Sequence, residues 1–161
     1  MKTTPSTLRT MAVALAPCLL LALPCTWGCE DDENFLEGSL DSQYDLSFDE
    51  VEATQFIQSR QLLVEYVRGG DEKPMIVTIV NPDGPGTFDY DAHEVNFSSS
   101  LPAGSGALPD VTSATVELEV FTPEVIDSEV EGAIHAMFTN TGTGDAFSLE
   151  GAFKTTLDVV P

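Results

Sequence analysis

Apolar and polar residues alternate along four stretches of the chain. Between positions 36 and 48 most even positions are apolar, and all six odd positions are polar. The same alternation returns at 114–120, 130–138 and 147–159. A period of two is typical of a β-strand with one face buried and one face in water. The pattern therefore predicts four half-buried strands.

Two further stretches, 61–67 and 74–80, are apolar on both faces and rich in Val, Ile and Leu. They predict central strands joined by a hairpin loop at 68–73. A shorter strand is expected at 93–97. The stretch that follows it, 98–109, holds several Ser, Gly and Pro residues and is expected to be the longest loop.

Residues 50–58 fit either a helix or a strand. Asp49, with Glu52 three residues later, resembles the capping box that begins a helix. Thr54, Phe56 and Ile57 favour a strand instead. Because the neighbouring segments are all predicted strands, we expect a strand here as well.

Six to eight antiparallel strands without a crossover helix predict an all-β domain. We expect a single antiparallel β-sandwich, with a small β-barrel as the alternative, because alternating faces suit both architectures. One register follows from the alternation itself. Segments 128–139 and 146–157 should form an antiparallel hairpin whose paired positions sum to 285, since only this sum, or one differing by two, joins inward residues to inward residues.

This register puts Phe138 opposite Phe147, and it pairs two glycines with large side chains. Gly132 should face Phe153, and Ile134 should face Gly151. Large cross-strand neighbours can cover the space that a glycine leaves in a sheet.

The first 28 residues differ from the rest of the chain. They contain no acidic residue, carry Lys2 and Arg9, and hold a nearly unbroken apolar run from 11 to 23. This order is typical of a secretory signal peptide. The run is shorter than the roughly 20 apolar residues that a membrane-spanning helix needs. We therefore expect a cleaved leader.

All three cysteines, Cys18, Cys25 and Cys29, lie within or just after this leader. A disulfide framework would place cysteines throughout the folded part of a secreted domain. The segment instead resembles a bacterial lipoprotein leader, in which signal peptidase II cuts before a cysteine that then carries lipid. Gly28 supplies the small residue expected before Cys29, which is the candidate lipid-attachment residue. Cys25 is the alternative, although Pro24 stands where that family has a small residue.

The resemblance implies a domain that is exported and held at a bacterial membrane by fatty acyl chains on Cys29. Glu30 follows the cysteine at the position that sorts such proteins in some bacteria, and it favours the outer membrane. The chain then divides into a signal peptide (1–28), an acidic tether (29–34) and an all-β domain (35–161).

The charge of the chain is strongly negative. It has 161 residues, with 27 Asp and Glu against 6 Lys and Arg, for a formal net charge of −21. Removing Lys2 and Arg9 with the leader leaves −23 on residues 29–161. Such a surface would be repelled by nucleic acids and by anionic lipid, and it favours a soluble monomer. Membrane attachment must therefore come from the covalent lipid.

Candidate chemistry is sparse. The exported part has two histidines, which is too few for the common zinc sites. His135 is expected to be exposed on a strand, and His93 to point inward beside Val95 and Phe97. Loop carboxylates and carbonyls can bind Ca²⁺, and one acidic stretch leaves that possibility open. That stretch contains Asn81, Asp83, Asp89, Asp91 and Glu94. We expect no cofactor, no metal and no catalytic residue.

These observations favour an exported, lipid-anchored all-β domain that acts as a non-enzymatic surface interaction or structural module. The alternative is a carrier of a small apolar ligand in a barrel-like cavity, where inward-facing Gly38, Gly132 and Gly151 would leave room. A hydrolase is the third hypothesis and rests on export alone. An internal apolar pocket would favour the carrier, and a histidine joined to converging carboxylates would favour the hydrolase.

Overall fold

The computed structural model of the chain describes residues 34–69, 71–102 and 106–161. The signal peptide predicted at 1–28, which we expect to form a detached helix, and Cys29 lie outside these residues. Within them the secondary structure is nine strands and one short 3₁₀-helix. These are β1 (Phe35–Glu37), η1 (Ser39–Ser42), β2 (Glu50–Phe56), β3 (Gln61–Arg68), β4 (Glu72–Val80), β5 (Gly86–Asp89), β6 (Val95–Ser100), β7 (Asp110–Val120), β8 (Glu129–Thr139) and β9 (Ala146–Val160). The all-β prediction is confirmed.

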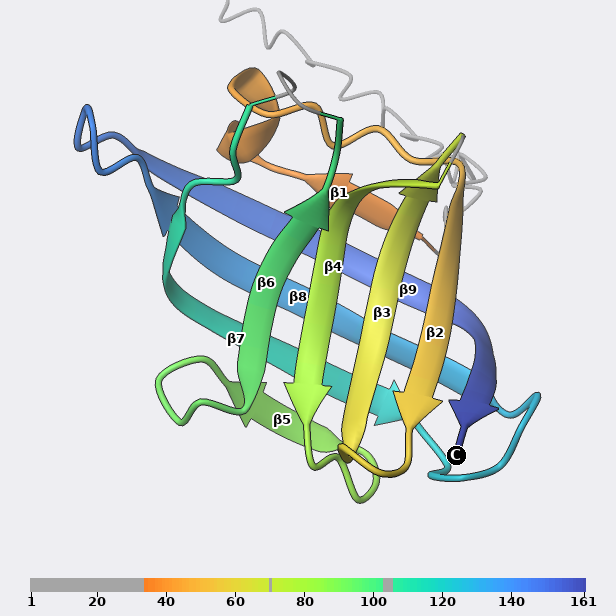
Figure 1. Cartoon of the computed structure of the whole chain (residues 1–161). Helices are drawn as coiled ribbons and strands as arrows, with labels where there is room; N and C mark the ends of the chain where they lie inside the picture. Colours follow the sequence, from red (N-terminus) through yellow and green to blue (C-terminus); the bar gives the residue numbers. More distant parts are fainter. Residues whose placement is uncertain (1–33, 70, 103–105) are drawn as a thin grey trace, which may run out of the picture. The chain divides into compact units, whose positions relative to one another are not determined.

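The strands form a mixed sheet that is nearly closed into a barrel. Its order is β5-β7-β8-β9-β2-β3-β4-β6, and β1 pairs with β9 outside this path. Figure 1 shows β6, β4, β3 and β2 as one layer, crossing over a second layer of β7, β8 and β9. The architecture therefore lies between the predicted sandwich and the predicted barrel.

The long strand β9 connects the two layers. Its first part pairs antiparallel with β8, and residues Leu157 to Val160 then run parallel to β2. The prediction of a purely antiparallel sheet is wrong at this single pair. The predicted count of six to eight strands is also too low, because β1 and β5 are very short. β5 holds only one buried residue, Phe88, so its sequence shows no alternation.

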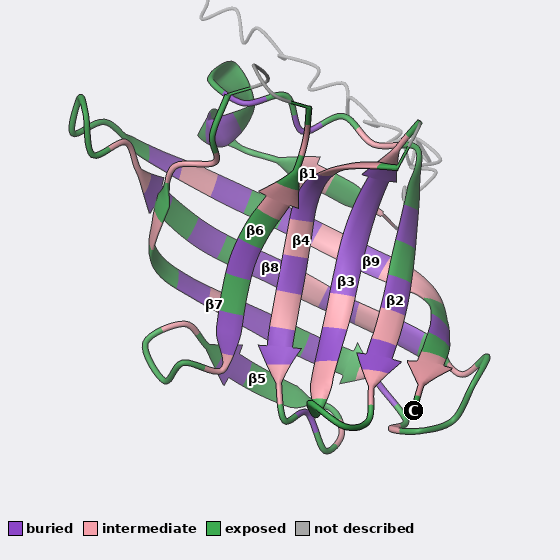
Figure 2. Ribbon diagram, viewed as in Figure 1, coloured by how far each residue is buried: buried purple, intermediate pink, exposed green. Residues whose placement is uncertain are grey.

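The core lies between the two layers. Burial alternates along β8 and β9, and Figure 2 shows the resulting bands of buried and exposed residues. Tyr66, Phe138 and Phe153 are 0% exposed and fill the interior with large side chains. Tyr66 also donates a hydrogen bond from Oη to the carbonyl of Ala152, 2.9 Å away, and burial raises its pKa.

The hairpin of β8 and β9 has the predicted register. Phe138 pairs with Phe147, Ile134 with Gly151 and Gly132 with Phe153, so each pair sums to 285. The ring of Phe153 lies over Gly132, where an added Cβ would come 2.6 Å from Cζ of Phe153. The predicted covering of this glycine is confirmed.

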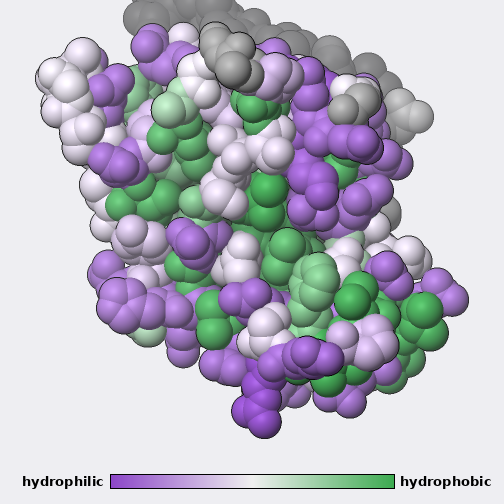
Figure 3. Space-filling view, viewed as in Figure 1, coloured by the Kyte–Doolittle hydropathy of each residue, from purple (hydrophilic) through white to green (hydrophobic). Residues whose placement is uncertain are grey.

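The central strands are also confirmed. β3 and β4 pair antiparallel, with β3 ending at Arg68 and β4 beginning at Glu72, and β2 occupies the segment that fitted either a helix or a strand. Some apolar side chains of β3 and β4, such as Leu63 and Ile76, are only half-buried on the outer face. Figure 3 shows the apolar surface that runs down the middle of this face.

The predicted strand at 36–48 is mostly wrong. Only Phe35–Glu37 pairs with β9, and the chain then turns into η1. Gly38 has a φ of 135°, and an added Cβ would lie 2.3 Å from the carbonyl oxygen of Ser148. Gly38 is therefore exposed and pressed against the β9 backbone, rather than directed into the interior as expected. The alternating burial still holds at Leu40, Tyr44 and Leu46, but without a sheet.

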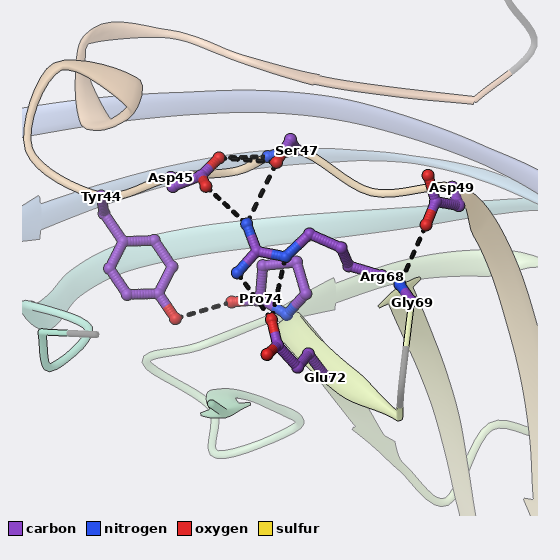
Figure 4. A network of polar contacts seen from close by, with 8 residues as sticks. All are labelled: Tyr44, Asp45, Ser47, Asp49, Arg68, Gly69, Glu72 and Pro74. Carbon is purple, nitrogen blue, oxygen red and sulfur yellow. Dashed lines mark hydrogen bonds and ion pairs between the residues drawn. The ribbon is translucent and has the colours of Figure 1, made fainter. Parts of the chain in front are cut away.

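Side-chain contacts, rather than strand pairing, fix residues 44–49. Arg68 donates to Asp45 (2.5 Å), Ser47 Oγ (3.1 Å) and Glu72 (2.9 Å), as Figure 4 shows. Tyr44 Oη donates to the carbonyl of Pro74, 3.0 Å away. The bonds to Glu72 and Asp45 raise the pKa of Arg68, and the bonds from Ser47 and Arg68 lower the pKa of Asp45. The network joins this segment to the β3–β4 hairpin.

Candidate functional site

A groove of about 710 Å³ lies on the outer face of the layer formed by β5, β7, β8 and β9, and is here named the outer groove. Its floor comes from strand positions whose side chains point away from the core. β7 contributes Ser113 and Thr115, β8 contributes His135 and Met137, and β9 contributes Ser148 and Glu150. Asp89, Asp91 and Ala92 form the margin at the end of β5.

Strand register places four of these side chains in one row. Asp89 pairs with Thr115, Thr115 with His135, and His135 with Glu150. Residues directly opposite in neighbouring strands lie on the same face, about 5 Å apart. The row therefore has a carboxylate at each end, with Thr115 and His135 between them. Glu37 of β1 pairs with Glu150 and continues the acidic end.

The turn after β5 positions the acidic margin. Asp89 donates its backbone N–H to the Glu94 carboxylate and accepts the Glu94 N–H at its carbonyl, both at 3.1 Å. His93 N–H donates to the carbonyl of Tyr90, 2.9 Å away. These bonds fix a tight turn that holds Asp91 beside the floor.

The floor of the outer groove is chemically mixed. Met137 is 41% exposed and presents an apolar side chain on the floor. Ser148 is engaged with Ser39, whose Oγ accepts the Ser148 N–H at 2.8 Å. No Lys or Arg is among the described residues that line the groove. The surface therefore offers carboxylates, hydroxyls and one apolar side chain to whatever binds there.

The groove lacks the hydrogen bonds of a preassembled catalytic centre. Nucleophilic catalysis places a hydroxyl within about 3 Å of a base that a third group orients. Within the described part of the chain, the His135 side chain forms no hydrogen bond or ion pair with another side chain. Neither the Ser113 hydroxyl nor the Thr115 hydroxyl is hydrogen-bonded to the His135 ring.

The structure confirms the prediction for His135 and contradicts the prediction for His93. His135 is exposed on β8, as expected. The expectation for His93 is wrong, because β6 begins only at Val95. His93 lies in the preceding turn, with a φ of 62°, and is exposed. A left-handed residue in a turn breaks the strand geometry on which the inward orientation depended.

The acidic stretch at 81–94 does not form one cluster. Asp89 and Asp91 face the outer groove, whereas Glu94 is bonded to the backbone of Asp89. Asn81 and Asp83 belong to the connection between β4 and β5 and do not line the groove. No set of three or more His, Cys, Asp or Glu side chains within the described ranges is arranged to hold a metal ion.

Comparison with protein-family models, with curated proteins and with solved structures gave no significant match. The candidate site is therefore inferred from the geometry of this chain alone. The part of the chain that the structure describes contains no helix long and apolar enough to cross a membrane. Cys29, the predicted lipid-attachment residue, precedes the described residues and stays a prediction.

Two smaller hollows also lie at the surface. One, of about 550 Å³, separates the free edge of β6 from residues 107–111, where the barrel does not close. The other, of about 260 Å³, lies where β2 meets the end of β9. Both are lined mainly by polar groups. Both lie outside the interior, which large side chains fill.

Proposed function

We propose that the chain is an exported, lipid-anchored domain that acts as a non-enzymatic interaction module and binds its ligand in the outer groove. The leader and Cys29 supply the anchor, by their resemblance to bacterial lipoproteins. A single acyl chain holds a protein only marginally at a membrane, whereas the several chains of a lipoprotein hold it stably. The tether from Cys29 to Asn34 spans at most about 20 Å when extended. The domain would thus stay close to the membrane surface.

The observation that carries the proposal is the position and chemistry of the outer groove. It has the size of a ligand site and lies outside a core that remains packed. Its floor lies on three hydrogen-bonded strands, β7, β8 and β9, so a partner would find the side chains already in place. Preformed sites lose less conformational freedom on binding.

The other two hypotheses fit this geometry less well. A carrier needs an internal apolar space, but Tyr66, Phe138 and Phe153 occupy the interior. The presence of His135 among three carboxylates in the outer groove favours the hydrolase hypothesis. The hydrolase hypothesis is weakened because, among the described residues, the His135 ring is hydrogen-bonded to no nucleophile.

The experiment is purification of the full-length protein from its own membrane. Intact-mass measurement should give a mature chain that begins at Cys29 and carries lipid. Thr115→Trp should fill the middle of the groove without reaching the core and should release a bound partner. Thr54→Trp makes the same change on the outer face of β2 and serves as the matched control.

Three results would overturn the proposal. One is an unmodified mature chain whose cleavage is unaffected by Cys29→Ser, with lipid absent from Cys25 as well. Another is an identical set of bound proteins for Thr115→Trp, Thr54→Trp and the parent. The third is hydrolytic turnover that His135→Ala abolishes.

A further inference from the structure

We infer that the outer groove takes an extended, basic polypeptide segment with two Lys or Arg side chains four residues apart. This inference rests on the proposed function, because it names the partner of that same groove. It is carried by the spacing of the carboxylates, by the floor between them and by the charge of the whole domain.

The spacing of the carboxylates sets the spacing of the cations. Asp89 and Glu150 stand at the two ends of the cross-strand row, three strand separations apart. Neighbouring strands lie about 4.8 Å apart, so the backbone positions that carry the two carboxylates are about 14 Å apart. In an extended peptide, side chains four residues apart point the same way and are also about 14 Å apart. Asp91 adds a second carboxylate beside Asp89.

The floor suits the residue between the two cations. That residue would face Thr115, His135 and the exposed side chain of Met137. Methionine adapts its shape to different apolar groups, so a Val or Leu side chain could pack on it. Hydroxyls of Ser113 and Thr115 can bond the peptide backbone. A simple diamine would satisfy the carboxylates and leave this floor uncovered.

The domain has few cations of its own to compete for the groove. Arg68 pairs with Asp45 and Glu72, and Lys73 pairs with Glu65 at 2.7 Å. Lys154 lies near Glu129 and Glu131, at 3.9 and 3.5 Å. These pairs all lie outside the outer groove, and within the described ranges no cation forms an ion pair with Asp89, Asp91 or Glu150. The net charge of −23 on residues 29–161 would also attract a basic partner over long range at low salt.

The test measures binding of fluorescein-labelled Arg-Thr-Val-Thr-Arg to the full-length protein in detergent. Fluorescence anisotropy should show saturable binding that weakens as sodium chloride rises. Glu150→Gln should raise Kd about two- to fivefold, the range expected for one exposed ion pair. Glu150→Gln combined with Asp89→Asn should raise Kd about tenfold. Glu124→Gln removes the same charge from the distant β7–β8 loop and should leave Kd unchanged.

A second peptide, Arg-Thr-Val-Arg-Thr, has the same composition but places its arginines on opposite faces of an extended chain. It should bind several times more weakly. Equal binding of the two peptides, equal effects of Glu150→Gln and Glu124→Gln, or displacement by spermidine at the same concentration as by peptide would overturn the inference. So would a complete lack of binding.

The outcomes separate this inference from the proposed function. If the lipidated protein loses its partner with Thr115→Trp but binds neither peptide, only the inference is contradicted. A protein without lipid on Cys29 contradicts the anchor, whether or not the peptide binds. Thermal unfolding of each variant verifies that a change in Kd does not arise from a lost fold.

Discussion

At the scale of single residues, Gly132 stands where the fold leaves no space for a side chain. An added Cβ would lie 2.3 Å from the carbonyl oxygen of Glu117 and 2.6 Å from Cζ of Phe153. The Phe153 ring could rotate slightly, but the backbone of β7 cannot retreat without breaking its pairing. The close approach of Phe153 followed from the predicted register, whereas the approach of Glu117 depends on β7, whose register was not predicted.

Gly132→Ala is therefore expected to destabilise the domain by about 1–3 kcal/mol, the usual cost of overpacking a core. Gly84→Ala is the control, because an added Cβ there meets nothing within 4 Å. It should leave stability unchanged or raise it by up to about 1 kcal/mol. Urea unfolding of both variants gives the comparison. Equal urea midpoints for the two variants would show that the β7 backbone moves to admit the added methyl group at a lower cost than this packing implies.

At the scale of elements, alternation identified most strands but did not distinguish a strand from any other half-buried segment. Leu40, Tyr44 and Leu46 alternate in burial while the chain makes a 3₁₀ turn and an irregular run. This segment is held against the β3–β4 hairpin by hydrogen bonds that involve the side chains of Tyr44 and Asp45. Those partners, Arg68 and Pro74, are more than twenty residues away, so local pattern could not reveal them.

The bonds to Asp45 make this element sensitive to acid. Hydrogen bonds from Ser47, and then Arg68, lower the pKa of Asp45 below its ordinary value of 3.8. A depressed folded-state pKa stabilises the folded protein above the unfolded-state pKa, and this contribution disappears as the pH falls through the folded value. Asp45→Asn should therefore lower the urea midpoint at pH 7, and its difference from the parent should shrink below about pH 4.

Asp41→Asn provides the matched control for that experiment, because Asp41 lies in η1 outside the Arg68 network. It should leave the urea midpoint nearly unchanged at both pH values. A loss at pH 7 as large as that of Asp45→Asn would show that the general charge of the segment, rather than the bonds to Ser47 and Arg68, determines its stability.

At the scale of the whole molecule, the sequence could predict the part of the outer groove that β8 and β9 form. The predicted sum of 285 already places His135 beside Glu150, because that pair belongs to the same hairpin. Asp89 and Asp91 could not be added, since β5 has one buried residue and gives no strand signal. β5 pairs with β7, which is distant in sequence, and no alternation of apolar and polar residues predicts this pairing. The outer groove exists only once both pairings are made.

The charge of the whole molecule leads to the last prediction. Residues 29–161 carry −23, so the folded domain repels itself, and salt should relieve that repulsion. The Debye length falls from about 30 Å at 0.01 M to about 10 Å at 0.1 M salt. Raising sodium chloride over this range should increase stability by roughly 1 kcal/mol, or about 4 °C in Tm.

Ion pairs such as that of Arg68 with Asp45 weaken under the same conditions, but acidic residues far outnumber the cations that can pair with them. Calcium chloride at matched ionic strength should follow the same curve, because the described residues contain no cluster arranged to hold a metal ion and screening depends on ionic strength. A fall in Tm with sodium chloride would contradict the self-repulsion. A large rise at micromolar calcium would instead place a calcium site in the acidic stretch at 81–94.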